Sequence, residues 1–244
     1  LLDATSALPA TLTLAGRAKP PSTRARTLVR APFELRGARR AFLEIVPLSG
    51  VAPVIELLEH GVCLLRAPLR FALAMPPVSE RDVELPLRLI VDADELPTNA
   101  SRSALREDTD LARLAEEAAI PALIEAVRAL VAALRGQGAP PDDMELTLPS
   151  VEEAELVLSG IVGQIRRILR SRGMVPGELA TLLDLPLLDS AFGGTLPLRA
   201  FDDPKAPLRI WRGAAPLPEA LRPWLREVIW LKDRLSEQLL AGIP

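Results

Sequence analysis

The chain has 244 residues, of which 49% are hydrophobic, 25% charged and only 3% aromatic, and its formal net charge is −3. This size and composition are ordinary for a globular protein with one large domain or two small ones, and the negative charge argues against a dedicated nucleic-acid-binding protein. A single cysteine, Cys63, excludes an internal disulfide, and a single histidine, His60, excludes a metal cluster built on histidines.

Three further features of the whole sequence bear on its origin and location. No uninterrupted apolar run is long enough to span a bilayer, so we expect no membrane association and a cytoplasmic location. The chain begins Leu1-Leu2-Asp3 without a methionine or a charged leader, which suggests part of a longer polypeptide rather than a signal peptide. Basic residues are almost all arginine, a bias typical of high-GC bacterial genomes.

Residues 1–35 are interpreted as the tail of a preceding domain or a linker. A short alternating strand at 11–14 is followed by Pro20-Pro21, which interrupts regular structure. An arginine-rich region begins here, and we interpret it as a solvated strand surface rather than a phosphate-binding patch. Its members are Arg24, Arg26, Arg30, Arg36, Arg39 and Arg40.

The next residues predict a layer of strands with one helical crossover. Strands are expected at 42–46, 62–65 and 69–75, and the strand context of Cys63 makes it a small buried hydrophobic residue. A short helix is expected over 51–59, ended by His60-Gly61, so His60 is interpreted as a helix-end residue. Together these elements predict an α/β fold.

A strand with period-two alternation is predicted over 83–91, and a polar loop follows it. Pro97 disfavours helix at the residue before it and fixes an extended or turned backbone there. Asn99, Ser101 and Ser103 can hydrogen-bond nearby backbone, which suits a loop or the start of a helix. Residues 83–106 are therefore predicted to be a strand, a polar loop and a helix start.

The sequence of residues 91–102 is Val-Asp-Ala-Asp-Glu-Leu-Pro-Thr-Asn-Ala-Ser-Arg. It resembles the catalytic loop of the ninety-kilodalton heat-shock chaperones, in which a Val-Asp-x-x-Asp-Leu-Pro-x-Asn-x-Ser-Arg pattern closes the first part of the middle domain. The resemblance extends weakly over residues 36–136, and it implies an α/β domain of the chaperone middle-domain type at 36–137. It also implies a stress-response protein that assists protein folding.

In that family the loop arginine contacts the γ-phosphate of ATP held by a separate N-terminal domain, and Arg102 matches this position. The resemblance thus makes Arg102 and Asn99 candidate catalytic residues, and Arg102 and Arg106 candidate nucleotide contacts, with ATP and magnesium bound by a domain upstream of this chain. Arg106 stands where the family usually has a glutamine. An arginine suits the role because a permanently charged guanidinium stabilises the negative charge that develops on a transferred phosphoryl group.

After the loop, apolar residues at helical spacing predict helices over about 108–134, with Asp108 or Thr109 as cap and Pro121 as a kink or a second start. The segment 139–143 is the clearest boundary, and a strand is expected at 144–148. Ser150 and Glu153 form a capping-box pattern for the next helix.

Residues 138–244 are predicted to form a mostly helical C-terminal domain with a small β-hairpin. Residues 173–183 resemble the middle of a helix-turn-helix, but no basic recognition helix follows them. A hairpin is expected around Gly193-Gly194, a last strand at 208–211, and a closing helix from about Pro218 to Leu240.

Three functions are compatible with this sequence. The first is the middle and C-terminal segment of an ATP-dependent chaperone-like protein that acts on a client or partner protein. The second is a non-catalytic interaction scaffold, suggested by Arg106 and by the apolar closing helix. The third, a helix-turn-helix regulator, rests on the arginines at 166, 167, 170 and 172 and is opposed by the net negative charge. The isolated chain is predicted to be a monomer because its own elements can cover the closing helix.

Overall fold

The computed structural model describes residues 12–14, 17–19, 27–47, 54–69, 86–99, 105–106, 110–172, 181–201 and 209–241. The chain forms two compact units, residues 1–154 and 155–244, and each is considered by itself. The predicted mixed α/β class is confirmed, because a mixed six-stranded sheet is combined with several helices.

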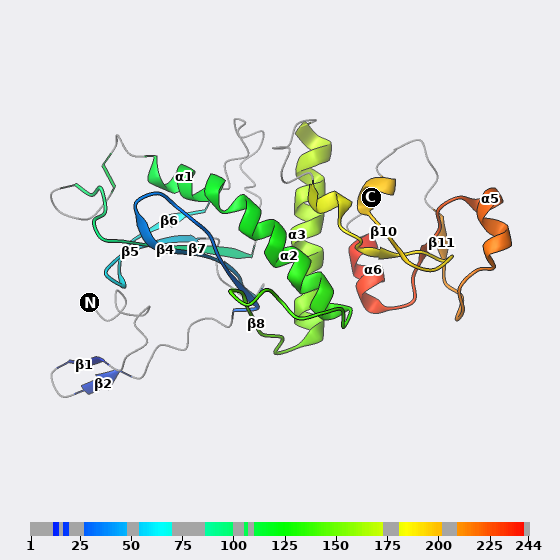
Figure 1. Cartoon of the computed structure of the whole chain (residues 1–244), viewed down its shortest axis with the longest axis horizontal. Helices are drawn as coiled ribbons and strands as arrows, with labels where there is room; N and C mark the ends of the chain where they lie inside the picture. Colours follow the sequence, from blue (N-terminus) through cyan, green and yellow to red (C-terminus); the bar gives the residue numbers. More distant parts are fainter. Residues whose placement is uncertain are drawn as a thin grey trace. The chain divides into compact units, whose positions relative to one another are not determined.

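The first unit is built on a sheet whose strand order is β6-β5-β7-β4-β3-β8 (Figure 1). Neighbouring strands are antiparallel except for β5 and β7, which run parallel. The bounds are β3 Val29–Pro32, β4 Ala38–Ile45, β5 Val54–Glu59, β6 Val62–Pro68, β7 Leu87–Ala93 and β8 Glu145–Leu146. A separate two-stranded hairpin, β1 Leu12–Leu14 and β2 Arg17–Lys19, precedes the sheet in the chain.

The predicted helix at 51–59 is wrong, because its described part, 54–59, is strand β5. The run Val-Ile-Glu-Leu-Leu-Glu has apolar residues at a spacing that fits a helix and also fits a strand buried on both faces. His60 and Gly61 have φ values of 51° and 81°, as in a type I′ hairpin turn, so they join β5 to the antiparallel strand β6. His60 is therefore a hairpin-turn residue and not a helix end.

The other strand predictions in this unit are largely confirmed, with shifted bounds. Strand β4 covers 42–45 of the predicted strand 42–46, and β6 contains the predicted strand 62–65. Strand β7 begins at Leu87 and ends at Ala93, while residues 83–85 lie outside the described residues. Of the predicted strand 69–75, Leu69 is buried after the end of β6 and the remainder lies outside the described residues.

Two helices, α1 Leu111–Ala118 and α2 Ile120–Leu134, cross the sheet (Figure 1). Pro121 lies in the first turn of α2, where its missing N–H costs no hydrogen bond, so of the two predicted alternatives, a kink and a second start, the structure shows the second start. Helix α2 packs on β3 and β4 and buries Leu123, Val127 and Leu130. Gly136, with φ of 64°, follows the helix end, in agreement with the predicted stop.

Both faces of the sheet carry buried apolar residues. The row Val29–Ile45–Leu87 is apolar and completely or almost completely buried. On the opposite face Leu58, Cys63 and Ile90 form a second apolar cluster, with Phe42 packed against it. Strand β7 is consequently buried on both faces.

Strands β3 and β8 belong to the same sheet although they are far apart in sequence. Val29 pairs with Leu146 and Arg30 with Glu145. The sheet thus extends beyond the predicted 36–137 domain on both sides. The predicted strand at 144–148 is confirmed for 145–146, and the Glu153 N–H donates to Ser150 Oγ at 3.4 Å, as the capping pattern predicted.

The second unit contains most of α3 Val151–Arg172 and several short elements. The predicted hairpin is confirmed: β9 Leu188–Asp189 pairs antiparallel with β10 Thr195–Leu196, and Gly193 and Gly194 have positive φ. The other elements are the 3₁₀ helices η1 Thr181–Asp184, η2 Leu198–Phe201 and η3 Glu219–Leu221, the strands β11 Ile210–Trp211 and β12 Ile229–Trp230, and the helices α5 Arg222–Leu225 and α6 Arg234–Ala241.

The predicted continuous helix from Pro218 to Leu240 is wrong, because this stretch is divided into η3, α5, β12 and α6. Arg226 has φ of 55°, which ends α5. The β-branched Ile229 is buried in β12, which pairs in parallel with β11, so β11 is not the last strand. Helix α6 starts afresh after Asp233, whose carboxylate accepts the Ser236 N–H at 2.8 Å.

Candidate functional site

The described part of the motif, residues 91–99, forms the carboxyl end of β7 and the residues after it, beside the end of the parallel neighbour β5. Its first acid, Asp92, accepts the Gly61 N–H at 2.9 Å and so holds the turn between β5 and β6. Its second acid, Asp94, lies 3.4 Å from Arg39 Nε and 4.0 Å from His60 Nδ1. Both carboxylates therefore have partners within the fold and position the loop.

Leu96 is the apolar residue that anchors the loop to the core of the first unit. Leu96 is only 4% exposed, and its N–H donates to Glu59 Oε2 at 3.5 Å. After Pro97 the loop closes on itself, because Thr98 and Leu105 form an antiparallel bridge and the Arg106 N–H donates to the Pro97 carbonyl at 2.8 Å. These contacts join the described residues on the two sides of the segment, and we refer to them as the neck of the loop.

The candidate site residues fall at different places in this loop. Asn99 and Arg106 are exposed, and each adjoins one member of the Thr98–Leu105 bridge, so the structure brings them to the neck. Arg102 lies outside the described residues, between the two. The arrangement can present polar and cationic groups to a ligand held elsewhere, which is binding and electrostatic chemistry rather than nucleophilic chemistry.

A row of alternating charges crosses four strands on one face of the sheet. Glu145, Arg30, Glu44 and Arg88 stand side by side on β8, β3, β4 and β7. Glu44 is 1% exposed, and its carboxylate lies 3.7 Å from Arg30 Nε and 3.5 Å from Arg88 Nε. A one-residue shift of β4 would carry Glu44 to the apolar face, so the row fixes the register.

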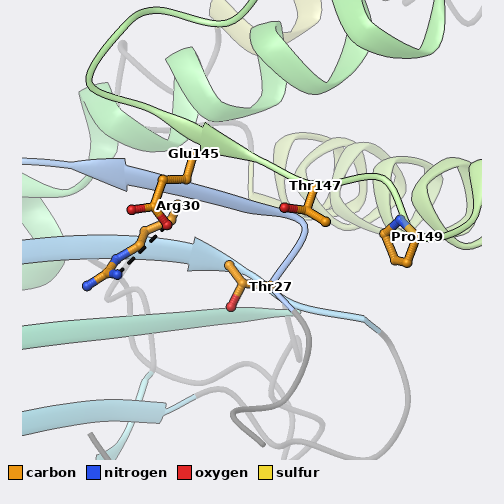
Figure 2. Close-up of a pocket in the computed structure, with 5 residues that line it drawn as sticks. All are labelled: Thr27, Arg30, Glu145, Thr147 and Pro149. Atoms are coloured by element: carbon orange, nitrogen blue, oxygen red, sulfur yellow. Dashed lines mark ion pairs between the residues drawn. The ribbon is translucent and has the colours of Figure 1, made fainter. Parts of the chain in front are cut away.

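A surface pocket of about 570 Å³ adjoins the outer end of this row (Figure 2). Arg30 Nη1 lies 3.9 Å from the exposed Glu145 carboxylate across its wall. Because that guanidinium also faces Glu44, its charge is compensated, and the pocket favours no small ion of either sign. The described residues that line it are Thr27, Arg30, Glu145, Thr147 and Pro149.

The other potentially reactive side chains, Cys63 and Ser236, are buried and take part in packing or helix capping. Cys63 is 7% exposed, as predicted, and burial, followed by the nearby Glu56 carboxylate, raises the pKa of its thiol, which suppresses the nucleophilic thiolate. Ser236 is 1% exposed and donates to the Asp233 carboxylate that caps α6. Within the described residues no group of three potential ligands is placed to hold a metal ion.

The sequence analysis did not identify Arg39 as the ion partner of Asp94 or Glu44 as the partner of Arg30 and Arg88, because it treated this arginine-rich region as a solvated surface. A sequence signal for the turn that supports the loop was available: His60-Gly61 lies between two apolar runs, which is a hairpin pattern.

Of the residues that carried the helix-turn-helix hypothesis, 173–180 and the side chains of Arg166, Arg167, Arg170 and Arg172 lie outside the described part, and 181–184 form η1.

No helix among the described residues has the length and apolarity to cross a membrane. Comparison of the chain with models of known protein families finds no match. Comparison with curated proteins also finds no similar sequence. A function for this chain therefore has to be argued from its own residues.

Proposed function

We propose that the chain is the middle and C-terminal part of an ATP-dependent chaperone-like protein. In this proposal the first unit is related to the chaperone middle domain, and the loop at 94–106 serves a nucleotide held with magnesium by a domain outside this chain. Arg102 contacts the γ-phosphate, and Asn99 and Arg106 complete the polar rim of the loop. The protein acts on a client or partner protein in the cytoplasm.

The observation that carries the proposal is the fixed neck of the loop at the carboxyl end of β7. The Thr98–Leu105 bridge, the buried Leu96 and the Asp92–Gly61 hydrogen bond hold both ends of the segment that contains Arg102. An arginine that stabilises charge in a transition state acts best when the residues that support it are held in place, and these contacts hold the described residues on either side of the segment. Delivery from a second domain would couple hydrolysis to domain docking.

The test is ATP hydrolysis by the longer protein that carries the nucleotide domain. Arg102→Ala should lower kcat by roughly 10³-fold or more while the KM for ATP changes little, because the arginine acts on transition-state charge. Arg128→Ala is the matched control, since this exposed arginine pairs with Glu125 on α2 and should leave turnover unchanged. Unchanged hydrolysis in Arg102→Ala would refute the assignment, as would robust turnover by the present chain alone.

The second candidate function is a non-catalytic interaction scaffold that keeps the fold. It is favoured by Arg106, which stands at the position of the family's glutamine, and by the exposed Trp224 in the second unit. Arg106→Gln separates the two functions. If the loop serves ATP, this variant should retain or increase hydrolysis, whereas a scaffold should show partner binding that is independent of both Arg102 and Arg106.

A further inference from the structure

The pocket beside β8 presents one cation and one anion on its wall. Figure 2 shows the Arg30 guanidinium and the Glu145 carboxylate there, 3.9 Å apart. Their side chains are 24% and 76% exposed, so a ligand in the pocket can reach both groups. The pocket volume of about 570 Å³ lies in the range of small-molecule sites.

The Arg30 guanidinium is held in place by contacts that do not use up its hydrogen-bond donors. It lies over the Phe42 ring, 3.9 Å from the ring centroid, and its Nε is 3.7 Å from the Glu44 carboxylate. Both carboxylate contacts of the guanidinium are longer than a hydrogen bond, and its Nε has no hydrogen-bond partner among the described residues. A guanidinium has five N–H donors, so its Nη groups can still bind a ligand carboxylate in the bidentate way that arginine favours.

The charges on this wall favour a ligand that carries both signs. A simple anion beside Arg30 would also face Glu145, and a simple cation beside Glu145 would also face Arg30. Like charges at this spacing repel, which offsets what the attractive partner supplies. A molecule with a carboxylate and an ammonium group on neighbouring atoms matches both members of the pair at once.

We propose that the pocket beside β8 binds the zwitterionic head of a free α-amino acid. The ligand carboxylate lies against the Arg30 guanidinium and the ligand ammonium group against the Glu145 carboxylate, so one long ion pair is replaced by two direct ones. Thr147 and Pro149, both exposed, line the pocket beyond this pair and contact the rest of the ligand. A peptide fits less well, because its terminal charges belong to different residues.

The inference goes beyond the proposed function and stands whether or not the loop at 94–106 serves a nucleotide. A ligand that binds only the folded chain raises its unfolding temperature, so each natural L-amino acid is added to the chain at about 10 mM and the unfolding temperature is measured. The amino acid with the largest effect is then titrated by calorimetry. Its N-acetyl and carboxamide derivatives should each bind about tenfold or more weakly, because each lacks one of the two charges.

Two conservative variants locate the binding site. Glu145→Gln should weaken binding of the selected amino acid by about tenfold or more, without a change in unfolding temperature, since the side chain is 76% exposed. Arg30→Lys keeps the positive charge that faces the buried Glu44 but loses the bidentate fork, and it should also weaken binding. Glu117→Gln is the matched control, because this exposed carboxylate is likewise paired with an arginine, Arg113, but lies on α1; it should bind unchanged.

Glu145→Lys provides a readout that a loss of stability could not imitate. The wall then carries two cations, which repel the ammonium group of a free amino acid and attract a carboxylate. The N-acetyl derivative, whose head group has only a negative charge, should therefore bind this variant more tightly than the free amino acid does. The order of the two affinities is thus reversed relative to the native chain.

Several results would overturn the proposal. They are a chain whose unfolding temperature no amino acid raises, derivatives that bind as tightly as the parent amino acid, and unchanged affinity in Glu145→Gln. Binding of acetate or methylammonium as tightly as the amino acid would indicate a site for a simple ion instead.

Discussion

At the scale of single residues, Glu44 is the most constrained side chain of the sheet. It is 1% exposed and lies between two guanidinium groups, those of Arg30 and Arg88. Arg88 is itself only 6% exposed, so its charge cannot be solvated by turning outward. Removal of one member of a buried ion pair leaves the other uncompensated, and this cost exceeds the value of the intact pair.

We therefore predict that Glu44→Ala lowers the free energy of unfolding by about 3 kcal/mol or more, as measured by urea denaturation. Replacing Glu44 and Arg88 together by leucine and methionine should recover part of this loss, because no buried charge is then left at either position. Glu145→Ala, at the 76% exposed end of the same row, should change stability by less than about 0.5 kcal/mol. Equal effects at positions 44 and 145 would contradict this account.

The sequence located the loop of the candidate site but not what holds it. A polar loop was predicted after a strand ending at 91; the strand continues to Ala93, and the described residues 94–99 follow it. The partners of Asp92 and Asp94 are the turn residues Gly61 and His60 and the strand residue Arg39. These contacts join segments more than twenty residues apart, and they depend on a hairpin that the local pattern did not reveal.

At the scale of elements, predictions succeeded where one local signal dominated. The hairpin at Gly193-Gly194 and the start of α2 at Pro121 are examples, since glycine and proline restrict the backbone on their own. The prediction for the residues of β5 failed because an apolar run that is buried on both faces has no distinctive period. The closing helix failed because pairing of β12 with β11 overrides the helical spacing of its apolar residues.

The turn after β11 provides a test of element packing. The indole of Trp211 donates to the Ala215 carbonyl at 2.8 Å, and the indole of Trp230 donates to the Gly213 carbonyl at 2.9 Å. A Cβ added at Gly213 would overlap the ring of Trp211, which cannot move away without losing its own hydrogen bond. Only glycine therefore fits between these two rings.

We predict that Gly213→Ala destabilises the second unit by about 1–3 kcal/mol. The matched control is Gly163→Ala in α3, where an added Cβ meets no other atom within 4 Å; it should gain about 0.5–1 kcal/mol because alanine favours helix. Tryptophan fluorescence during thermal unfolding measures both effects, because all three tryptophans lie at 211, 224 and 230 in this unit. A neutral Gly213→Ala would show that the turn is not held by the two indoles.

At the scale of the whole molecule, the division into an α/β part and a second part could be anticipated from the chain order of strands and helices. The extent of the sheet could not, because β8 joins β3 across more than one hundred residues of sequence. A two-residue strand has no period of its own, and only its partner identifies it. Strand pairing between distant segments therefore cannot be predicted from local sequence patterns.

The last prediction concerns self-association. Ile229 and Leu240 are buried within the second unit, and the Trp230 indole donates to the Gly213 carbonyl, so of the large apolar side chains Trp224, Ile229, Trp230 and Leu240 only Trp224 is highly exposed. A stable dimer buries about 800 Å² on each partner, several times what one indole supplies. Sedimentation at micromolar concentration should therefore give a single species near 26.4 kDa. A dimer that Trp230→Ser converts to a folded monomer would instead place β12 at a subunit interface.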